Sequence, residues 1–500
     1  MKNIKVLQCF LVTFLLTSCG GNISGSQTNT SEMTDETTSV VDSSLSTSSF
    51  DTTSENEEPI NFSIIGLNDF HGSVNEKISS YGYYEYGLGK LSTFIKHERN
   101  EQTSFVISSG DMWQGSIESN ENRGKFVTEA MNLMGFDSMT LGNHEFDWGT
   151  EIIQSNAELA NFPILAANII DEKDKLSNIK SSALIEKDNV KVGVIGIIGS
   201  NVYSSITATM TEDLIFDEES KYVIEESEKL REQGANFIIL SIHLGAADFS
   251  SNLIKSIVSS DIDLVLAGHS HREEVEEFYD NDFNVIPVLN AICNGEAFSK
   301  VEVQFDPKKQ ECEILNYDVY SFDDVEYTSL EEDPEIYELY KSKYDVDDLK
   351  NEVVGRANGY FTSTSNLPVM AAQAMYEKIS EEFAQYDIKG SVHNQARANL
   401  ESGEILYDDI YTSFPFENEI LIVEADKHYI YDLASTSNRY FNIGFDVNDI
   451  SDETFYFAGI DYVILKDFDT SECIKTGLFI RDIIVDYIKK VGTINSSDYY

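Results

Sequence analysis

Short runs of apolar residues recur along the chain from residue 61 onward. The runs read NFSIIGLND, SFVISSGD, DSMTLGNHE, FPILAANI, KVGVIGIIG, ANFIILSIHLG and IDLVLAGHSH. Several are separated by stretches such as LGKLSTFIKHERN and SKYVIEESEKLREQG, whose apolar spacing is typical of helices. Strands that alternate with helices predict an α/β fold, in which helices cover a sheet core. We therefore expect a first domain over residues 61–325.

The pattern changes after this first domain. The charged stretch SLEEDPEIYELYKSKYDVDDLKNEV is compatible with a helix and has Pro334 near its start. It predicts a linking helix over residues 326–350. Residues 351–500 carry a less regular mixture of helix and strand patterns. We expect them to form a second domain of the α+β class.

The N-terminus has the features of an export signal. Lys2 and Lys5 precede an apolar segment that closes with LLTSCG. This arrangement resembles a bacterial lipoprotein signal, with a signal peptide over residues 1–18 and Cys19 as the lipidated first residue. The alternative is an ordinary signal peptide with an incidental cysteine. We expect a protein anchored by lipid alone to the extracellular face of a bacterial membrane.

Residues 19–60 differ in composition from everything that follows. Ser, Thr, Asn and acidic residues dominate this segment, and large apolar residues are few. Such a composition cannot bury enough apolar surface to offset the entropy lost on ordering. It predicts a disordered tether between the lipid and the first domain.

Charge restricts the ligands that this chain can bind. The sequence has 87 Asp and Glu residues against 35 Lys and Arg, which gives a formal net charge of −52. The mean field therefore repels nucleic acid polymers and anionic bilayers. A small anionic substrate would need a local source of positive charge, such as metal ions.

Polar side chains concentrate where the apolar runs end. Five of the eight histidines lie at or just past the carboxyl ends of predicted strands, as do several Asp and Asn residues. The strand ends of an α/β sheet surround the crevice where such folds bind ligands. The candidate metal ligands are Asp69, His71, Asp111, Asn143, His243, His269 and His271. This set of nitrogen and oxygen donors suits Zn, Mn, Fe or Co, and two divalent ions that share one carboxylate would use all seven.

The motifs LNDFHG, GDMWQG, GNHEFDWG, HLG and GHSH occur in this order. They resemble the calcineurin-like metallophosphoesterases, and specifically the 5′-nucleotidase family of secreted two-domain phosphohydrolases. The resemblance implies an α/β/β/α sandwich of two sheets. It also implies two sets of metal ligands that share Asp111. The first set is Asp69, His71, Asp111 and His271, and the second is Asp111, Asn143, His243 and His269.

The same resemblance implies the catalytic residues. In the family, the histidine of the NHEFD motif contacts the phosphate and stabilises the transition state, and the aspartate three positions later orients that histidine. These residues are His144 and Asp147 here. Glu145 is expected to have a supporting or structural role. The attacking group would be a metal-bound water or hydroxide, so no nucleophilic Ser or Cys is required.

The second domain resembles the part of the family that recognises the substrate. Within VHNQARANLESGEILYDDIYTSFPFENEI, Arg397 matches the phosphate- or ribose-binding arginine, Phe416 the first base-stacking aromatic residue, and Asn418 its polar neighbour. Tyr462 is the candidate for the second stacking ring. The alternatives are that Phe416 is a core residue and that Arg397 forms a structural ion pair.

This part of the sequence also departs from the family. Asn394 and Gln395 stand where the family has two glycines, and GRANGYFTSTSNLPVMAAQAM lacks the usual paired arginines. The stretch GIDYVILKDFDTS lacks the expected GGDG turn. These departures concern the recognition of the nucleotide and leave the metal-ligand motifs untouched.

Together these features predict an extracellular metal-dependent phosphohydrolase that acts on nucleoside monophosphates or related organic phosphates. The alternatives within the enzymes are a 2′,3′-cyclic phosphodiesterase and a nucleotide-sugar pyrophosphate hydrolase. An alternative of another class is a surface lipoprotein that binds a ligand without turnover. The expected partner is a small nucleotide or organic phosphate, and a nucleic acid polymer is not expected.

Overall fold

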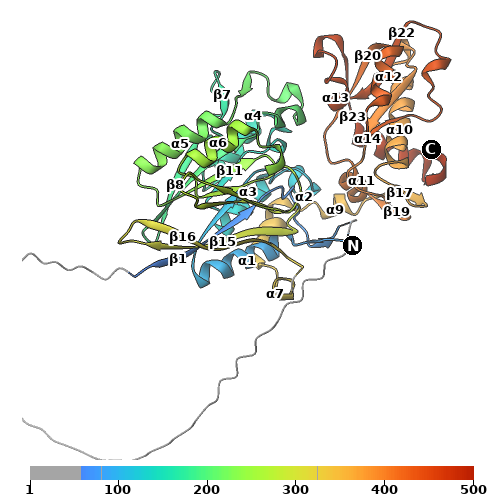
Figure 1. The fold of residues 1–500 in the computed structure, drawn as a ribbon. Coiled ribbons are helices and arrows are strands. Elements are labelled where there is room, and N and C mark those ends of the chain that lie inside the picture. Colours follow the sequence, from blue (N-terminus) through green and yellow to red (C-terminus); the bar gives the residue numbers. More distant parts are fainter. Residues whose placement is uncertain (1–57, 80–81, 324) are drawn as a thin grey trace, which may run out of the picture. The chain divides into compact units, whose positions relative to one another are not determined.

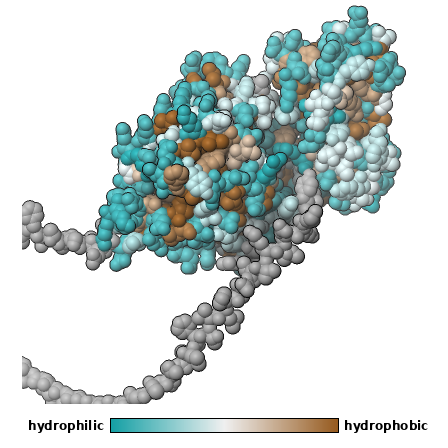
Figure 2. Space-filling model, viewed as in Figure 1, coloured by the Kyte–Doolittle hydropathy of each residue, from teal (hydrophilic) through white to brown (hydrophobic). Residues whose placement is uncertain are grey.

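A computed structural model describes residues 58–79, 82–323 and 325–500. The predicted signal peptide, Cys19 and nearly all of the tether lie outside the described residues. The first strand begins at Ile60. Among the described residues, no helix is both long enough and apolar enough to cross a bilayer. Most of the residues on the face shown in Figure 2 are hydrophilic, as the acidic composition leads one to expect.

Two six-stranded sheets form the first half of the described chain (Figure 1). The first sheet has the strand order β16 (Glu311–Ser321), β15 (Ala297–Asp306), β1 (Ile60–Leu67), β4 (Thr103–Ser108), β5 (Ser138–Thr140) and β6 (Ile164–Leu165). The second has the order β13 (Glu274–Tyr279), β14 (Val285–Asn290), β12 (Leu264–Leu266), β11 (Phe237–His243), β9 (Val190–Ile198) and β8 (Ser182–Lys187). In the first sheet, β1, β4, β5 and β6 run parallel, and the antiparallel strands β15 and β16 close one edge. In the second sheet, β14, β12, β11 and β9 run parallel, and an antiparallel strand closes each edge.

The apolar side chains of these sheets divide between two cores. One core, which includes Phe62 and Ile64 of β1 and Val192 of β9, lies between the sheets. The other includes Ile65 and Leu67, which point to the opposite face of β1, where helices cover the sheet. Helices α1 (Gly87–Glu101), α3 (Lys125–Met134) and α4 (Thr150–Leu159) lie over the first sheet, and α5 (Ser220–Glu232) and α6 (Ser251–Ser259) over the second. The predicted α/β/β/α sandwich is confirmed.

A separate core forms within residues 351–500. Its five-stranded sheet has the order β21 (Arg439–Phe441), β18 (Gly390–Asn394), β22 (Thr454–Ile460), β20 (Glu419–Asp426) and β23 (Ile474–Phe479). A three-stranded sheet contains β19 (Gly403–Leu406), β17 (Val353–Asn358) and β24 (Thr493–Asn495). The helices of this region include α10 (Asn366–Glu382), α11 (Tyr407–Ser413), α12 (Lys427–Ser435), α13 (Asp461–Ile464) and α14 (Ile480–Val491). The predicted mixture of helix and strand is present.

The segment between the two cores differs from the prediction. Instead of one linking helix over 326–350, the structure has α8 (Pro334–Leu339), a π turn over Tyr340–Tyr344 and α9 (Asp347–Lys350). The Tyr340 and Tyr344 rings both pack against Phe126, with centroids 5.5 and 5.4 Å away. The Tyr340 hydroxyl also donates to Asp347 at 2.7 Å. Tertiary packing of the two tyrosines thus accounts for the break in a sequence whose charge pattern favours a continuous helix.

Candidate active site

The predicted metal ligands follow the carboxyl ends of the parallel strands in both sheets. Asp69 comes two residues after β1, and Asp111 and Asn143 three residues after β4 and β5. His243 is the last residue of β11, and His269 follows β12. Because these strands end at one edge of the sandwich, residues far apart in sequence are brought together.

The first group of ligand atoms consists of Asp69, His71 and His271. The His271 Nε2 atom lies 3.3 Å from Asp69 Oδ1 and 3.0 Å from His71 Nε2. His71 Nδ1 lies 3.1 Å from the Gln114 carbonyl, to which it must donate because a carbonyl oxygen can only accept. Burial lowers the pKa of His71 to about 3, so the ring is neutral and its Nε2 lone pair faces the group. A second hydrogen bond that fixes the tautomer is a common feature of histidine ligands.

The second group consists of Asp111, His243 and His269. The His243 Nε2 atom lies 3.2 Å from Asp111 Oδ2 and 3.1 Å from Asn143 Oδ1. Its Nδ1 donates to the Ser109 carbonyl at 2.8 Å. Asn143 therefore points its neutral oxygen at the same space as the carboxylate and the imidazole.

The donor atoms fit divalent cations. Asp69 Oδ1 and Asp111 Oδ2 are buried side-chain oxygens that accept no hydrogen bond. Ligands that bind an ion at 2.0 to 2.2 Å lie roughly 2.9 to 3.5 Å from one another. The four distances between ligand atoms given above fall in this range. Two buried carboxylates with open lone pairs, each facing imidazole nitrogens at this spacing, are suited to hold divalent ions.

Both groups favour positive charge. Burial disfavours the charged form of His243, but the Asp111 carboxylate outweighs it and raises the pKa of His243 to about 9. Burial likewise opposes charge on His271, and Asp69 raises the pKa of His271 to about 10. Protons or divalent cations can supply this charge, and a metal ion that binds here displaces protons.

Much of the backbone at these strand ends is left-handed. Five of the seven predicted ligands have positive φ angles: Asp69 (49°), His71 (50°), Asp111 (54°), His269 (71°) and His271 (54°). Asp and His tolerate this region better than most residues, yet each such position stores on the order of 1 kcal/mol or more. This strain is maintained because surrounding hydrogen bonds fix the loops. Such strained positions are typical of functional sites, where the side chains must converge on one place.

Glu145 supplies several hydrogen bonds to the loop that carries Asp111. Its fully buried carboxylate accepts from the backbone N–H groups of Asp111 (2.8 Å), Met112 (2.9 Å), Trp113 (3.3 Å) and Gly142 (2.7 Å). These donors belong to the loops after β4 and β5. Burial raises the pKa of Glu145 to about 7. Glu145 thus ties together the two loops that carry Asp111 and Asn143.

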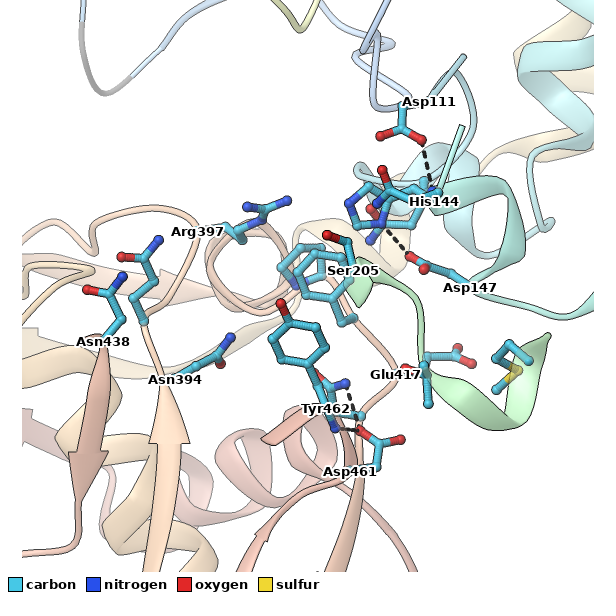
Figure 3. Close-up of a pocket in the computed structure, with 18 of the residues that line it drawn as sticks. Asp111, His144, Asp147, Ser205, Asn394, Arg397, Glu417, Asn438, Asp461 and Tyr462 are labelled. Carbon is cyan, nitrogen blue, oxygen red and sulfur yellow. Dashed lines mark hydrogen bonds and ion pairs between the residues drawn. The ribbon is translucent and has the colours of Figure 1, made fainter. Parts of the chain in front are cut away.

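His144 lies beside the two ligand groups. Its Nδ1 is 2.9 Å from Asp147 Oδ2, and its backbone N–H donates to Asp111 Oδ1 at 2.8 Å (Figure 3). Burial opposes a positive charge on His144, but the Asp147 and Asp111 carboxylates outweigh it and raise its pKa. The predicted pairing of His144 with Asp147 is therefore present in the structure.

One cavity of about 430 Å³ brings the predicted residues of both halves together. Among its lining residues are Asp111, Asn143, His144, Asp147, His269, His271, Arg397, Phe416, Asn418 and Tyr462. The other three predicted ligands, Asp69, His71 and His243, are buried and do not line it. A cavity of this size accommodates a small organic ligand.

The predicted recognition residues have defined contacts within this cavity. The Phe416 ring stacks on His144 with centroids 5.3 Å apart and 19° between the planes. The Arg397 guanidinium lies 5.0 Å from the centre of the Phe416 ring. Asn418 donates to Asp461 Oδ1 at 2.9 Å, and the Tyr462 backbone N–H donates to the same oxygen at 2.7 Å. Figure 3 shows Tyr462 projecting into the pocket.

The lining also includes charged residues that were not predicted from the sequence, among them Asp461, Lys466 and Arg439. Burial raises the pKa of Asp461 to about 6, and this carboxylate orients Asn418 and Tyr462. Lys466 places its Nζ atom 4.3 Å from the centre of the Tyr462 ring. Arg439 begins β21 after Asn438, which has a positive φ of 59°. Neither cation belongs to a recognisable motif, so only the fold places them in the cavity.

Comparisons with known proteins agree with this geometry. The calcineurin-like phosphoesterase family model matches residues 62–273. Endonuclease YhcR of Bacillus subtilis is 23% identical over 403 residues, and the match covers 74% of this chain but only 32% of that longer protein. A 5′-nucleotidase of Vibrio vulnificus is 24% identical over 408 residues, which is 71% of either chain.

The fold has solved counterparts as well. The crystal structure of a 5′-nucleotidase precursor from Thermus thermophilus matches with a TM-score of 0.72 at 17% identity. The match covers 87% of this chain and 97% of that one, so it spans both cores. From the family model we conclude that residues 62–273 form a calcineurin-like phosphoesterase domain and that the chain is a phosphoric ester hydrolase, similar in sequence and in fold to proteins named 5′-nucleotidase.

Proposed function

We propose that this protein removes phosphate from nucleoside monophosphates or related organic phosphates at a centre of two divalent metal ions. One observation carries the proposal. Two buried carboxylates, Asp69 and Asp111, each keep an oxygen without a hydrogen bond next to an imidazole nitrogen. This arrangement lies against the cavity that His144 and Arg397 line. Relatives named 5′-nucleotidase support the substrate class.

Seven residues would hold the ions. Asp69, His71, Asp111 and His271 would bind one, and Asp111, Asn143, His243 and His269 the other. Two bound divalent ions polarise a phosphoryl oxygen and bring the pKa of water toward neutrality. Zn, Mn, Fe and Co are all compatible with this donor set.

His144 would act on the phosphate directly. Asp147 holds its Nδ1, which leaves Nε2 as the atom available to a phosphoryl oxygen. The Asp147 and Asp111 carboxylates raise the pKa of His144 and so favour positive charge on the ring, where negative charge develops in the transition state. Asp147 is then a positioning residue, because it acts through His144.

The cavity wall from the second core would recognise the rest of the substrate. Arg397 can bind a phosphate or the ribose, and Phe416 and Tyr462 offer aromatic faces to a base. The Asn418 amide nitrogen donates to Asp461, so its side-chain oxygen is the atom that would accept a hydrogen bond from the substrate.

Two alternative reactions are compatible with the same centre, namely hydrolysis of 2′,3′-cyclic phosphodiesters and of nucleotide-sugar pyrophosphates. Asn394 and Gln395 line the cavity and stand where the family pattern has glycines, so both alternative reactions are included in the test. The calcineurin-like phosphoesterase domain favours an enzyme over a lipoprotein that only binds its ligand.

We also propose, from the signal-like N-terminus, that the protein is located outside the cell and is anchored there by a lipid on Cys19.

Hydrolysis of a substrate panel tests this function, with phosphate release measured for the monoesters and product formation for the diesters and pyrophosphates. The purified protein is assayed with Mn or Zn on nucleoside monophosphates, cyclic nucleotides, nucleotide sugars and bis(aryl) phosphate. We expect the highest kcat/KM for monophosphates. A preference for cyclic nucleotides or nucleotide sugars would support the corresponding alternative. No hydrolysis of any compound, with two ions bound, would contradict the proposed substrate class.

A further inference from the structure

The cavity contains more positive charge than one phosphate requires. Arg397, Arg439 and Lys466 all line it. In the described part of the chain, none of the three forms an ion pair with a carboxylate; Arg397 and Lys466 contact aromatic rings, and Arg439 contacts a backbone carbonyl. In a protein with 87 acidic residues, unpaired cations gathered in one cavity are unexpected.

The carboxylates that line the same cavity are already engaged. Asp147 binds His144, and Asp461 accepts from Asn418. Glu417 lies 2.8 Å from Arg123 and 3.9 Å from Arg481. The fourth carboxylate, that of Asp111, belongs to the ligand groups described above. The cavity therefore has uncommitted positive charge and no uncommitted negative charge to balance it.

Arg439 is the least satisfied of these cations. Its guanidinium makes one hydrogen bond, from Nη1 to the Asn438 carbonyl at 3.2 Å, although the group has five N–H donors. Its Nε atom is buried and has no partner. The neighbouring His393 adds no second positive charge, because burial lowers the pKa of this imidazole to about 4 and leaves it neutral. A buried donor without a partner is costly unless a ligand satisfies it.

The strand pairing places an amide beside this arginine. Arg439 of β21 is directly opposite Asn394 of β18, and both residues line the cavity. Figure 3 shows Asn394 and Asn438 on one side of the pocket, and His144, Asp147 and Asp111 on the other. Asn394 is one of the two residues that replace glycines of the family pattern. The amide and guanidinium donors together suit an anion on the side of the cavity away from the metal-ligand groups.

We propose that Arg439 and Asn394 form a second anion-binding site, which takes a further phosphate group of the substrate. The inference rests on the proposed function, because the metal-ligand groups, His144 and Arg397 already account for the phosphate that is released. The preferred substrates are then nucleotides with a second phosphate on the ribose, away from the bond that is cleaved. Lys466 adds to the positive field of the cavity but is placed against Tyr462.

The test compares kcat/KM for adenosine 5′-monophosphate, adenosine 2′,5′-bisphosphate and adenosine 3′,5′-bisphosphate. For the wild-type protein, we expect one bisphosphate to exceed the monophosphate by about 10- to 100-fold, the range of a charge-assisted hydrogen-bonded contact. Arg439→Ala should bring that ratio close to one, and Asn394→Gly should lower it by a smaller factor. Calorimetric binding of the preferred bisphosphate should weaken in parallel.

Arg356→Ala is the matched control, since Arg356 is an exposed arginine of β17 that does not line the cavity. It should leave the ratio unchanged. If Arg439→Ala does not fold, as judged by circular dichroism, Arg439→Gln removes the charge while keeping a polar side chain. Equal losses on all three substrates would show a structural role for Arg439 and overturn the proposal. Monophosphate turnover without any preference for a bisphosphate would overturn the second site alone, whereas no turnover at all would contradict the proposed function.

Discussion

The two walls of the cavity are organised in opposite ways. On the side of the strand ends, the polar groups around Asp111 are fixed by other parts of the protein: Glu145 binds the loop backbone and Ser109 binds His243. On the side of the second core, Arg397 and Arg439 have few partners. The first wall is built before any substrate arrives, and the second has donors left for it. Under the proposed function, the chemistry lies in one core and substrate recognition in the other.

The largest effect on turnover is expected when His144, the residue of the first wall that is proposed to contact the phosphate, is replaced. His144→Ala should lower kcat/KM on a nucleoside monophosphate by about 10²- to 10⁴-fold, because a charge-stabilising and proton-donating group is lost. Metal content should stay at the wild-type level, since His144 is not among the proposed ligands. His428→Ala is the control, because that histidine is exposed on α12 and pairs with Asp432, far from the proposed ligands in sequence. Near wild-type turnover in His144→Ala would refute its role.

A smaller effect is expected from loosening the first wall without touching a proposed ligand. Glu145→Gln replaces one acceptor oxygen by an NH₂ group that faces backbone N–H donors. We expect kcat/KM to fall by about 10- to 100-fold, as is usual for residues that orient metal ligands. The free energy of unfolding should fall by about 1 to 3 kcal/mol, as measured by denaturant unfolding. Unchanged values of both would show that the loops do not depend on Glu145.

The second wall should respond in its preference among substrates. Phe416→Ala should weaken binding of a nucleoside monophosphate by about 1 to 3 kcal/mol, the usual contribution of base stacking. A simple aryl phosphate, which carries no base, should be affected much less. KM or a competition constant for the two compounds checks the difference. Equal weakening would indicate that Phe416 only supports His144, on which its ring stacks.

The smallest effect is expected from the exposed ion pair between Arg123 and Glu417, a residue that lines the cavity. Arg123 pairs with Glu417 at 2.8 Å, and the two side chains are 37% and 38% exposed. An ion pair this exposed contributes little, so Arg123→Ala should change the free energy of unfolding by less than about 1 kcal/mol. Thermal or denaturant unfolding measures it. A loss of several kcal/mol would mean that this ion pair helps to hold the cavity together.

The polar residues of the first wall could be predicted from the sequence because they come directly after predicted strands. The apolar runs end just before Asp69, Asp111 and Asn143, and parallel strands bring such residues to one edge. The left-handed backbone at Asp69 and His269 had no sequence signal, since neither is glycine. Such conformations depend on hydrogen bonds from distant loops, which periodicity does not reveal.

The second wall could be predicted only in part. Phe416 and Arg397 were identified through motif resemblance, but the stacking of Phe416 on His144 depends on packing between residues from different cores. Arg439 and Lys466 lie in stretches without any motif. The break in the expected helix over 326–350 has the same origin, because the contacts of Tyr340 with Phe126 cannot be read from local sequence.

The most direct test of the account is the number of metal ions bound per chain. The protein is loaded with Mn or Zn, freed of excess metal and analysed by inductively coupled plasma mass spectrometry, for the wild type and for Asp111→Ala. The account predicts two divalent ions per wild-type chain and a loss of at least one when the proposed shared carboxylate is removed. A wild-type protein that binds no divalent ion, or an Asp111→Ala variant that still binds two, would contradict it.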